Sequence, residues 1–83
     1  MIYKLLYTKT AFDDVQKLDN VVKKRIKKKL EEYSKNPLSH AKKLINFSIG
    51  IYRWRIGNFR VVFDIDKDKI IILRIGHRRE IYK

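Results

Sequence analysis

The chain has 83 residues, of which 21 are Lys or Arg and 9 are Asp or Glu, so its formal net charge is +12. This length allows one small domain, residues 1–83, and an apolar share of 45% is enough for a folded core, which argues against intrinsic disorder. The absence of cysteine excludes a disulfide scaffold, a thiolate metal site and a cysteine nucleophile, and no stretch is apolar enough to predict a signal peptide or a membrane span.

The first half of the chain predicts one strand and two helices. Residues 2–7 are nearly all apolar or aromatic, which favours a short strand. Thr8 or Thr10 offers an N-cap for a helix that continues to about Leu18. A second helix is predicted over residues 21–34, with one apolar stripe at Val22, Ile26, Leu30 and Tyr33. The short link between the two helices predicts an antiparallel helical hairpin.

The second half of the chain predicts three more strands. Asn36-Pro37 ends the second helix, and residues 38–46 are ambiguous: either a loop, or a loop with one helical turn near residues 40–44. From Phe47 the period of the pattern is two, and strands are expected at about 49–56, 59–66 and 70–77. The order β-α-α-β-β-β predicts an α+β fold in which the helical hairpin packs on one face of a small, mainly antiparallel four-stranded sheet.

Side chains alternate along these strands and predict two different sheet faces. Trp54 and its apolar neighbours alternate with Arg53 and Arg55, so the apolar side chains are expected under the helices. The same alternation places Ile71, Leu73 and Ile75 toward the core. The outer face is then expected to gather Arg53, Arg55, Arg60 and Arg74, followed by Arg78 and Arg79. Arginine suits phosphate and the net charge favours a polyanionic partner, so this face is interpreted as a phosphate-binding surface; the alternative is an ordinary polar face.

Two segments near the C-terminus resemble one known family. The segment YRWRIGNFRVVF at residues 52–63 resembles the central hairpin of RelE-like toxins, which belong to the RelE/ParE superfamily of bacterial and archaeal toxin–antitoxin systems. The ending IGHRREIY at residues 75–82 resembles the C-terminal motif of that family. The predicted element order and the length also match, so the resemblance covers essentially the whole chain.

The resemblance implies a cytoplasmic toxin of a type II toxin–antitoxin system. Such a toxin is an endoribonuclease that enters the ribosomal A site, cleaves mRNA there and so inhibits translation. The ribose 2′-OH attacks the adjacent phosphate, and because this nucleophile is already in the RNA, neither a metal nor a cofactor is expected. The implied partners are the ribosome, mRNA and a cognate antitoxin of the RelB type. A net charge of +12 predicts that this antitoxin is acidic.

Three residues match functional positions of the family. Arg60 matches the arginine that stabilises charge on the scissile phosphate, which is electrostatic catalysis. Arg78 matches the arginine near the leaving 5′ oxygen, which has been proposed as the acid. Tyr82 matches the C-terminal tyrosine that stacks on or orients the substrate, a task that suits an aromatic ring.

One departure from the family concerns the general base. Arg53 and Arg55 stand where the best-known members carry lysines, one of which has been assigned as the base. Arginine is a poor base because it does not lose its proton near neutral pH. The base is therefore expected to be His77, Glu80 or a group of the ribosomal RNA. The arginines expected to bind RNA are Arg53, Arg55, Arg74 and Arg79, and Arg55 is also counted among the catalytic candidates.

Two other functions stay open. One is a ParE-like toxin, which shares the fold but inhibits DNA gyrase without cutting anything. The other is a basic RNA-binding domain without catalysis, with an RNA affinity that falls as salt rises. The combination of Arg60, Arg78 and Tyr82 favours the enzyme.

Overall fold

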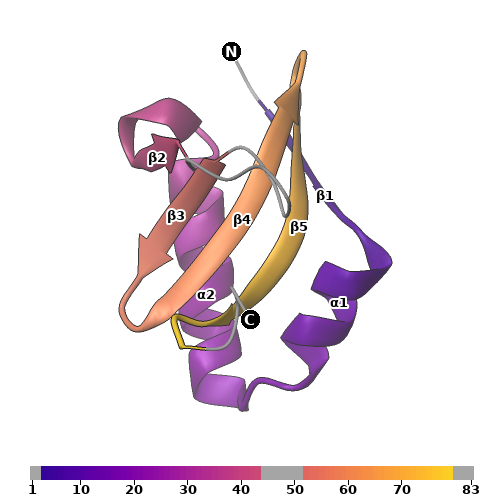
Figure 1. The fold of residues 1–83 in the computed structure, drawn as a ribbon, viewed down its shortest axis with the longest axis vertical. Helices are drawn as coiled ribbons and strands as arrows, with labels where there is room; N and C mark the ends of the chain where they lie inside the picture. Colours follow the sequence, from indigo (N-terminus) through magenta and orange to yellow (C-terminus); the bar gives the residue numbers. More distant parts are fainter. Residues whose placement is uncertain (1–2, 44–51, 80–83) are drawn as a thin grey trace.

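The protein is a two-layer α+β domain (Figure 1). The computed structural model describes residues 3–43 and 52–79. The elements are β1 (Lys4–Tyr7), α1 (Lys9–Gln16), α2 (Asn20–Tyr33), the 3-10 helix η1 (Pro37–Ser39), β2 (Ala41–Lys43), β3 (Tyr52–Ile56), β4 (Phe59–Asp66) and β5 (Lys69–His77). The strands form one sheet in the order β1-β5-β4-β3-β2, in which only the β1–β5 pair is parallel. The predicted α+β fold is confirmed, with five strands in place of four.

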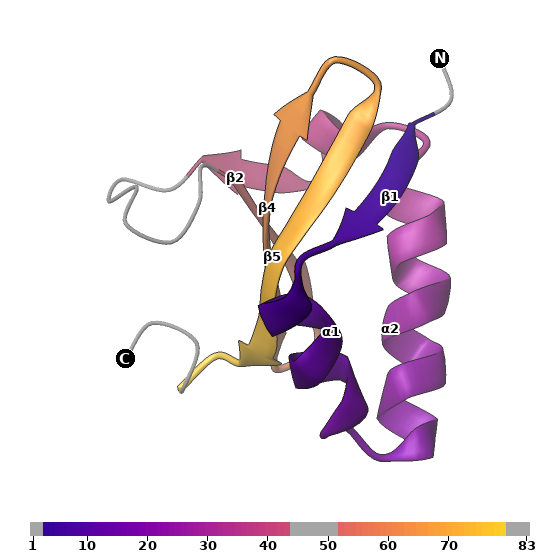
Figure 2. The same cartoon turned by 90° about the vertical axis from the view of Figure 1, so that its right-hand side faces the viewer.

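Both helices begin at the residues that local sequence favours. The Thr8 hydroxyl accepts a hydrogen bond from the Ala11 amide at 3.1 Å, and the Asp19 carboxylate accepts one from the Val22 amide at 3.0 Å. The helices run in opposite directions, as predicted. Figure 2 shows α2 lying along one face of the sheet, while α1 lies below the end of β1. Within the described ranges, no helix is long and apolar enough to cross a membrane.

The core lies between α2 and the sheet. Trp54 and Phe63 are fully buried there, with their rings 4.0 Å apart, and Ile26 and Leu30 of α2 close over the cluster. The expectation that Trp54 belongs to the core is confirmed.

The predicted alternation along β5 is wrong in its first half. Ile70 and Ile72 are buried in the core with Ile75, whereas Leu73 is only partly buried. The pairing between β4 and β5 slips here, because Val62 pairs with Arg74 but Phe63 pairs with Ile72, which leaves Leu73 as the extra residue of a β-bulge. One extra residue reverses which side chains point inward. Alternation alone cannot reveal a bulge.

The fifth strand lies in the segment that the sequence left ambiguous. Residues 41–43 form β2, so the alternative of a helical turn near residues 40–44 is wrong; a single 3-10 turn occurs earlier, at η1. The Trp54 indole N–H donates to the Pro37 carbonyl at 3.0 Å, which fixes this turn against the core. Ala41 then pairs with Trp54 as an antiparallel neighbour. The predicted strand at 49–56 is confirmed over residues 52–56; its first residues lie outside the described ranges.

Candidate nucleic-acid interface

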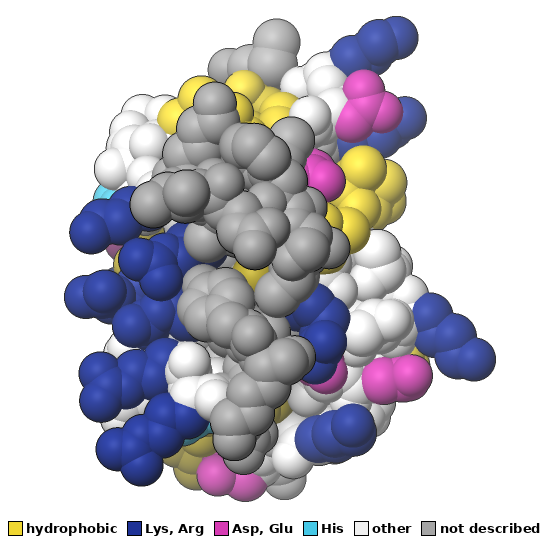
Figure 3. All heavy atoms as spheres, in the orientation of Figure 1, with side chains coloured by type: hydrophobic (Ala, Val, Ile, Leu, Met, Phe, Trp, Pro, Cys, Tyr) yellow, Lys and Arg dark blue, Asp and Glu magenta, His cyan; other side chains and the backbone are white. Residues whose placement is uncertain are grey.

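Two arginines face each other on the sheet surface that lies away from α2. Arg55 of β3 and Arg60 of β4 are directly paired, and Arg53 lies two residues along β3 on the same face. Like charges in direct cross-strand positions destabilise a sheet, so this arrangement has a cost that folding alone does not require. Figure 3 shows Lys and Arg side chains gathered along the side of the molecule formed by β2, β3 and the β3–β4 turn.

The β3–β4 turn fixes the position of Arg60. The Arg60 side chain is only 6% exposed, and its Nη1 donates to the carbonyl oxygens of Phe59 at 3.1 Å and Gly57 at 3.4 Å. Gly57 has a φ of +58°, the left-handed conformation that suits the first central residue of a type II′ hairpin turn. The guanidinium is therefore held by the backbone of its own hairpin, and its placement depends on the turn.

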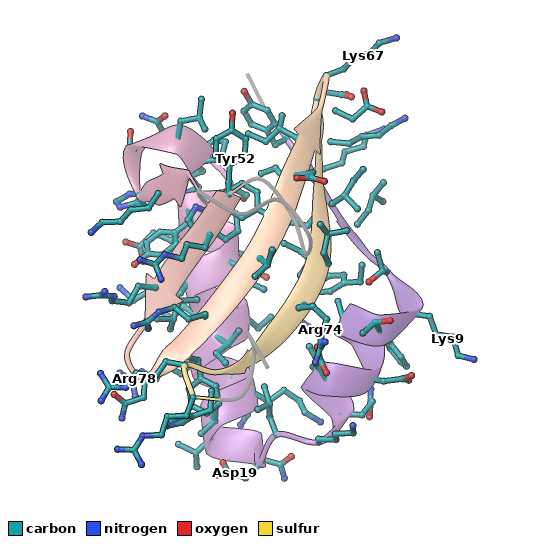
Figure 4. All side chains as sticks on the ribbon, viewed as in Figure 1. Lys9, Asp19, Tyr52, Lys67, Arg74 and Arg78 are labelled. Carbon is teal, nitrogen blue, oxygen red and sulfur yellow. The ribbon has the colours of Figure 1, made fainter. Side chains whose placement is uncertain are left out.

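Two further arginines meet at the same turn. The Arg78 amide donates to the Asn58 carbonyl oxygen at 2.9 Å, which places the start of the C-terminal motif beside the turn, as Figure 4 shows. Arg25 of α2 reaches the turn from the other layer, since its Nη2 lies 2.9 Å from the point where a Cβ on Gly57 would stand. Arg25 is a basic neighbour of the site that the sequence pattern did not reveal, because nothing local links α2 to the hairpin.

Arg74 has a different environment from Arg60. The register places it beside Val62, but its Nε donates to the Asp14 carboxylate of α1 at 2.9 Å. The same carboxylate oxygen accepts the Ile75 amide at 3.0 Å. This amide belongs to the part of β5 that β1 no longer covers, since β1 pairs only as far as Ile72. Asp14 thus substitutes for a neighbouring strand, and Arg74 is joined to α1 (Figure 4).

His77 does not lie with the paired arginines. It pairs with Phe59, whose side chain packs against the core, so the register places His77 on the helix side of the sheet. Its ring meets the Phe59 ring edge-on at 5.8 Å between centroids, and its Nδ1 accepts the Arg79 amide at 3.3 Å. Together with Arg74, Asp14 and Lys17, it lines a pocket of about 260 Å³ beside α1.

Of the remaining predicted residues, one lies within the described ranges and two lie outside them. Arg79 is exposed just after β5, whereas Glu80 and Tyr82 lie outside the described residues. Among residues 3–43 and 52–79, no three His, Cys, Asp or Glu side chains come together in a way that could hold a metal ion.

Comparison with known proteins identifies the family. A family model described as "ParE toxin of type II toxin-antitoxin system, parDE" matches residues 5–82. Toxin RelE3 of Methanocaldococcus jannaschii is 36% identical over 83 residues, which cover 95% of this chain and 94% of that protein. Toxin RelG of Mycobacterium tuberculosis is 30% identical over 86 residues, covering 100% of this chain and 99% of that one. This chain is a toxin of the RelE/ParE family.

Solved structures support the same conclusion for the fold. The toxin–antitoxin complex RelBE2 from Mycobacterium tuberculosis contains a chain that is 28% identical, with a TM-score of 0.84, over 94% of this chain and 100% of that one. The isolated Escherichia coli RelE toxin is 28% identical, with a TM-score of 0.74, over 96% and 90%. The RelE-like fold expected from residues 52–63 and 75–82 is therefore confirmed.

The RelE-like toxin carries a lysine beside its arginines that the sequence interpretation missed. Lys42 of β2 pairs with Arg53 of β3 and is exposed. Because paired residues share a face, Lys42 extends the surface that carries Arg53 and Arg55. We call the set Lys42, Arg53, Arg55 and Arg60 the basic sheet face. The sequence did not reveal this position because β2, the strand that carries Lys42, has only three residues and shows no recognisable alternation.

The toxin also has an apolar groove between its two helices. It has a volume of about 320 Å³ and is lined by Tyr7, Phe12, Val15, Gln16, Leu18, Lys23, Ile26, Lys27 and Leu30. Phe12, which lines this groove, is 56% exposed. Burial, and then the negative charge of Glu31, raise the pKa of the Tyr7 phenol above its ordinary value, so this ring stays uncharged at neutral pH.

Proposed function

We propose that this toxin is a ribosome-dependent endoribonuclease that acts in the cytoplasm and cleaves mRNA in the ribosomal A site. The observation that carries the proposal is the placement of Arg60. It is nearly buried, it is held by the carbonyl oxygens of its own turn, and it faces Arg55 across the strand pair. A guanidinium held in advance of the reaction stabilises charge that develops on a phosphate without reorganising during the reaction.

The proposed reaction gives the arginines of the site and Tyr82 separate roles. The ribose 2′ oxygen attacks the adjacent phosphate, and Arg60 stabilises the negative charge that develops on it. Arg78, fixed beside the same turn, lies near the leaving 5′ oxygen. Arg53 and Arg55 bind neighbouring phosphates, because the arginine fork matches phosphate geometry. Tyr82 stacks on a base of the substrate, and Arg79 adds positive charge at the end of β5.

His77 and Arg74 have a different role in this proposal. Both line the pocket beside α1, and Arg74 is ion-paired with Asp14. We assign them to the stability of the β5 end, and therefore exclude His77 as the general base. A His77→Gln variant is expected to cleave within about threefold of the native rate, since no acid–base step is then removed.

The test uses purified toxin with mRNA-programmed ribosomes, and the mRNA ends are mapped by primer extension. We expect a cut within the A-site codon that is absent on naked mRNA. Arg60→Ala should lower the cleavage rate by at least about 100-fold, the usual effect of removing one charge-stabilising donor. Lys28→Ala, on the exposed side of α2, is the matched control for lost positive charge. Cleavage by Arg60→Ala at the native rate would contradict the proposal.

Inhibition of DNA gyrase is the second candidate, and the family description favours it, since the matching model describes ParE toxins. A gyrase supercoiling assay distinguishes the two functions. The endoribonuclease proposal predicts no inhibition at toxin concentrations that cleave mRNA. Inhibition of supercoiling without any mRNA cut would replace the first function with the second.

The proposed partner is an acidic antitoxin. A related chain, 32% identical with a TM-score of 0.73, was solved in the RelB-RelE antitoxin-toxin complex of Methanococcus jannaschii. The groove between α1 and α2 has an apolar floor with Lys23 and Lys27 beside it, which suits an amphipathic helix with acidic flanks. Phe12→Asp should weaken antitoxin binding at least about tenfold in calorimetry while leaving mRNA cleavage unchanged. Equal affinities would exclude the groove as the binding site.

A further inference from the structure

We propose that Lys42 is the general base of this toxin. The inference rests on the proposed endoribonuclease function and answers a question that the sequence raised, because Arg53 and Arg55 cannot remove a proton from the ribose 2′-OH. The structure places one lysine next to them, on a strand that the sequence did not predict.

The sheet register brings Lys42 within reach of the scissile phosphate. Lys42 pairs with Arg53, and Arg60 pairs with Arg55, so Lys42 and Arg60 are two strands and two residues apart on one face. At ordinary strand spacings this corresponds to about 12 Å between their Cα atoms. The Arg60 guanidinium is held at the turn, and the long Lys42 side chain rises from the same face, so RNA that lies along this face can contact both.

Other titratable groups on the sheet are less well placed. The register puts Lys4 and Lys69 at the opposite end of β5, next to Asp66. His77 lies on the helix side, beside Phe59. Asp64 of β4 alternates with the core residues Phe63 and Ile65 and so also lies on this face, four residues from Arg60 along the strand. Within the basic sheet face itself, Lys42 is the group that can exist in a neutral form and accept a proton.

Among the described residues, the charged side chains that the register places next to Lys42 are positive. Arg53 faces it directly from β3, and Arg55 lies diagonally across on the same strand. The 3-10 helix η1 contributes no titratable side chain, and the His40 that follows it stacks its ring on Tyr33 at 4.3 Å between centroids. Arg53 and Arg55, which are proposed to bind phosphates, therefore lie directly beside the proposed base.

In the proposed step, neutral Lys42 Nζ takes the proton of the 2′-OH, and the 2′ oxygen forms a bond to phosphorus. The bond between phosphorus and the 5′ oxygen breaks, and the leaving oxygen takes a proton from water. The products are a 2′,3′-cyclic phosphate and a 5′-hydroxyl, and the Lys42 ammonium then returns its proton to the solvent.

The decisive variant is Lys42→Arg, which keeps the positive charge but cannot act as a base. Single-turnover cleavage on programmed ribosomes is measured from about pH 6 to about pH 9, where a lysine base makes the rate rise with pH. We expect Lys42→Arg to cleave at least about 100-fold more slowly than the native toxin and to lose that rise. Ribosome binding and thermal unfolding are measured in parallel, and both should stay unchanged. Lys28→Arg, on the exposed side of α2, is the matched control and should behave like the native toxin.

The outcomes test the role of Lys42 as the base separately from the endoribonuclease function. If Lys42→Arg cleaves at the native rate with the native pH dependence, Lys42 contributes charge alone and the inference is wrong, while the endoribonuclease function stands. If the slower rate comes with an unchanged pH dependence, Lys42 is not the base either. If the native toxin cuts no mRNA on ribosomes, there is no step for a base to assist, and both proposals fail together.

Discussion

Arg60 and Arg74 carry the same group on neighbouring strands, yet their surroundings differ in kind. Arg60 is held at the β3–β4 turn by the carbonyl oxygens of Gly57 and Phe59. Arg74 is held by the Asp14 carboxylate of α1. Hydrogen bonds to carbonyl oxygens orient the Arg60 guanidinium, whereas the Asp14 carboxylate at 2.9 Å both orients Arg74 and offsets its charge.

The hydrogen bonds in these two regions serve different purposes. At the turn, three consecutive carbonyl groups, those of residues 57–59, accept hydrogen bonds from the residues proposed to act on RNA. At α1, the Asp14 carboxylate completes the edge of β5, and Arg74 lies over that contact. The β3–β4 turn gathers arginines, whereas the part of β5 beside α1 is arranged around the closing of a strand edge. A shared residue type therefore does not predict a shared role.

The largest effect is expected when the two arginines are replaced in the same way. Arg60→Lys keeps the charge but loses the planar fork, and mRNA cleavage should fall about 100-fold. Arg74→Lys can still pair with Asp14, and cleavage should stay within about threefold of the native rate. Cleavage on programmed ribosomes measures both. An equal loss in the two variants would place Arg74 on the RNA-binding surface, as the sequence alone suggested.

A smaller effect, on stability alone, is expected from Asp14. Its side chain is 11% exposed and accepts both the Arg74 Nε–H and the Ile75 amide. Asp14→Ala removes both contacts and leaves the Ile75 amide without this acceptor, so the free energy of unfolding should fall by about 2 kcal/mol. Asp14→Asn retains an acceptor oxygen and should lose less. Urea unfolding measures both variants, and a loss of cleavage in the folded Asn variant would contradict a purely structural role.

The smallest effect is expected at the start of α1. Thr8 caps this helix through the Ala11 amide, and its hydroxyl donates to the Leu73 carbonyl oxygen at 3.2 Å. Thr8→Ala should lower the free energy of unfolding by about 1 kcal/mol, and Thr8→Ser, which keeps the hydroxyl, by clearly less. Thermal unfolding distinguishes them. Equal losses would show that the methyl group, rather than the hydroxyl, stabilises this end of the sheet.

Local sequence patterns predicted the elements and the family of this toxin. Apolar spacing of three and four residues marked α2, and Thr8, one of two candidate caps, marked where α1 begins. Alternation along residues 52–56 separated Trp54, in the core, from Arg53 and Arg55, on the outer face. These signals are readable because each one depends on residues close together in the chain, whose spacing matches the period of a helix or a strand.

Contacts between distant segments decided the rest. The bulge at Leu73 reversed the faces of β5, β2 brought Lys42 beside Arg53, and α1 supplied Asp14 to Arg74. None of these follows from spacing along the chain, because each depends on which strand or helix lies next to another after folding. The sequence alone determined that this protein gathers arginine on one sheet face. The tertiary structure decided what each of those arginines contacts, since only packing brings residues 14 and 74, or 42 and 53, together.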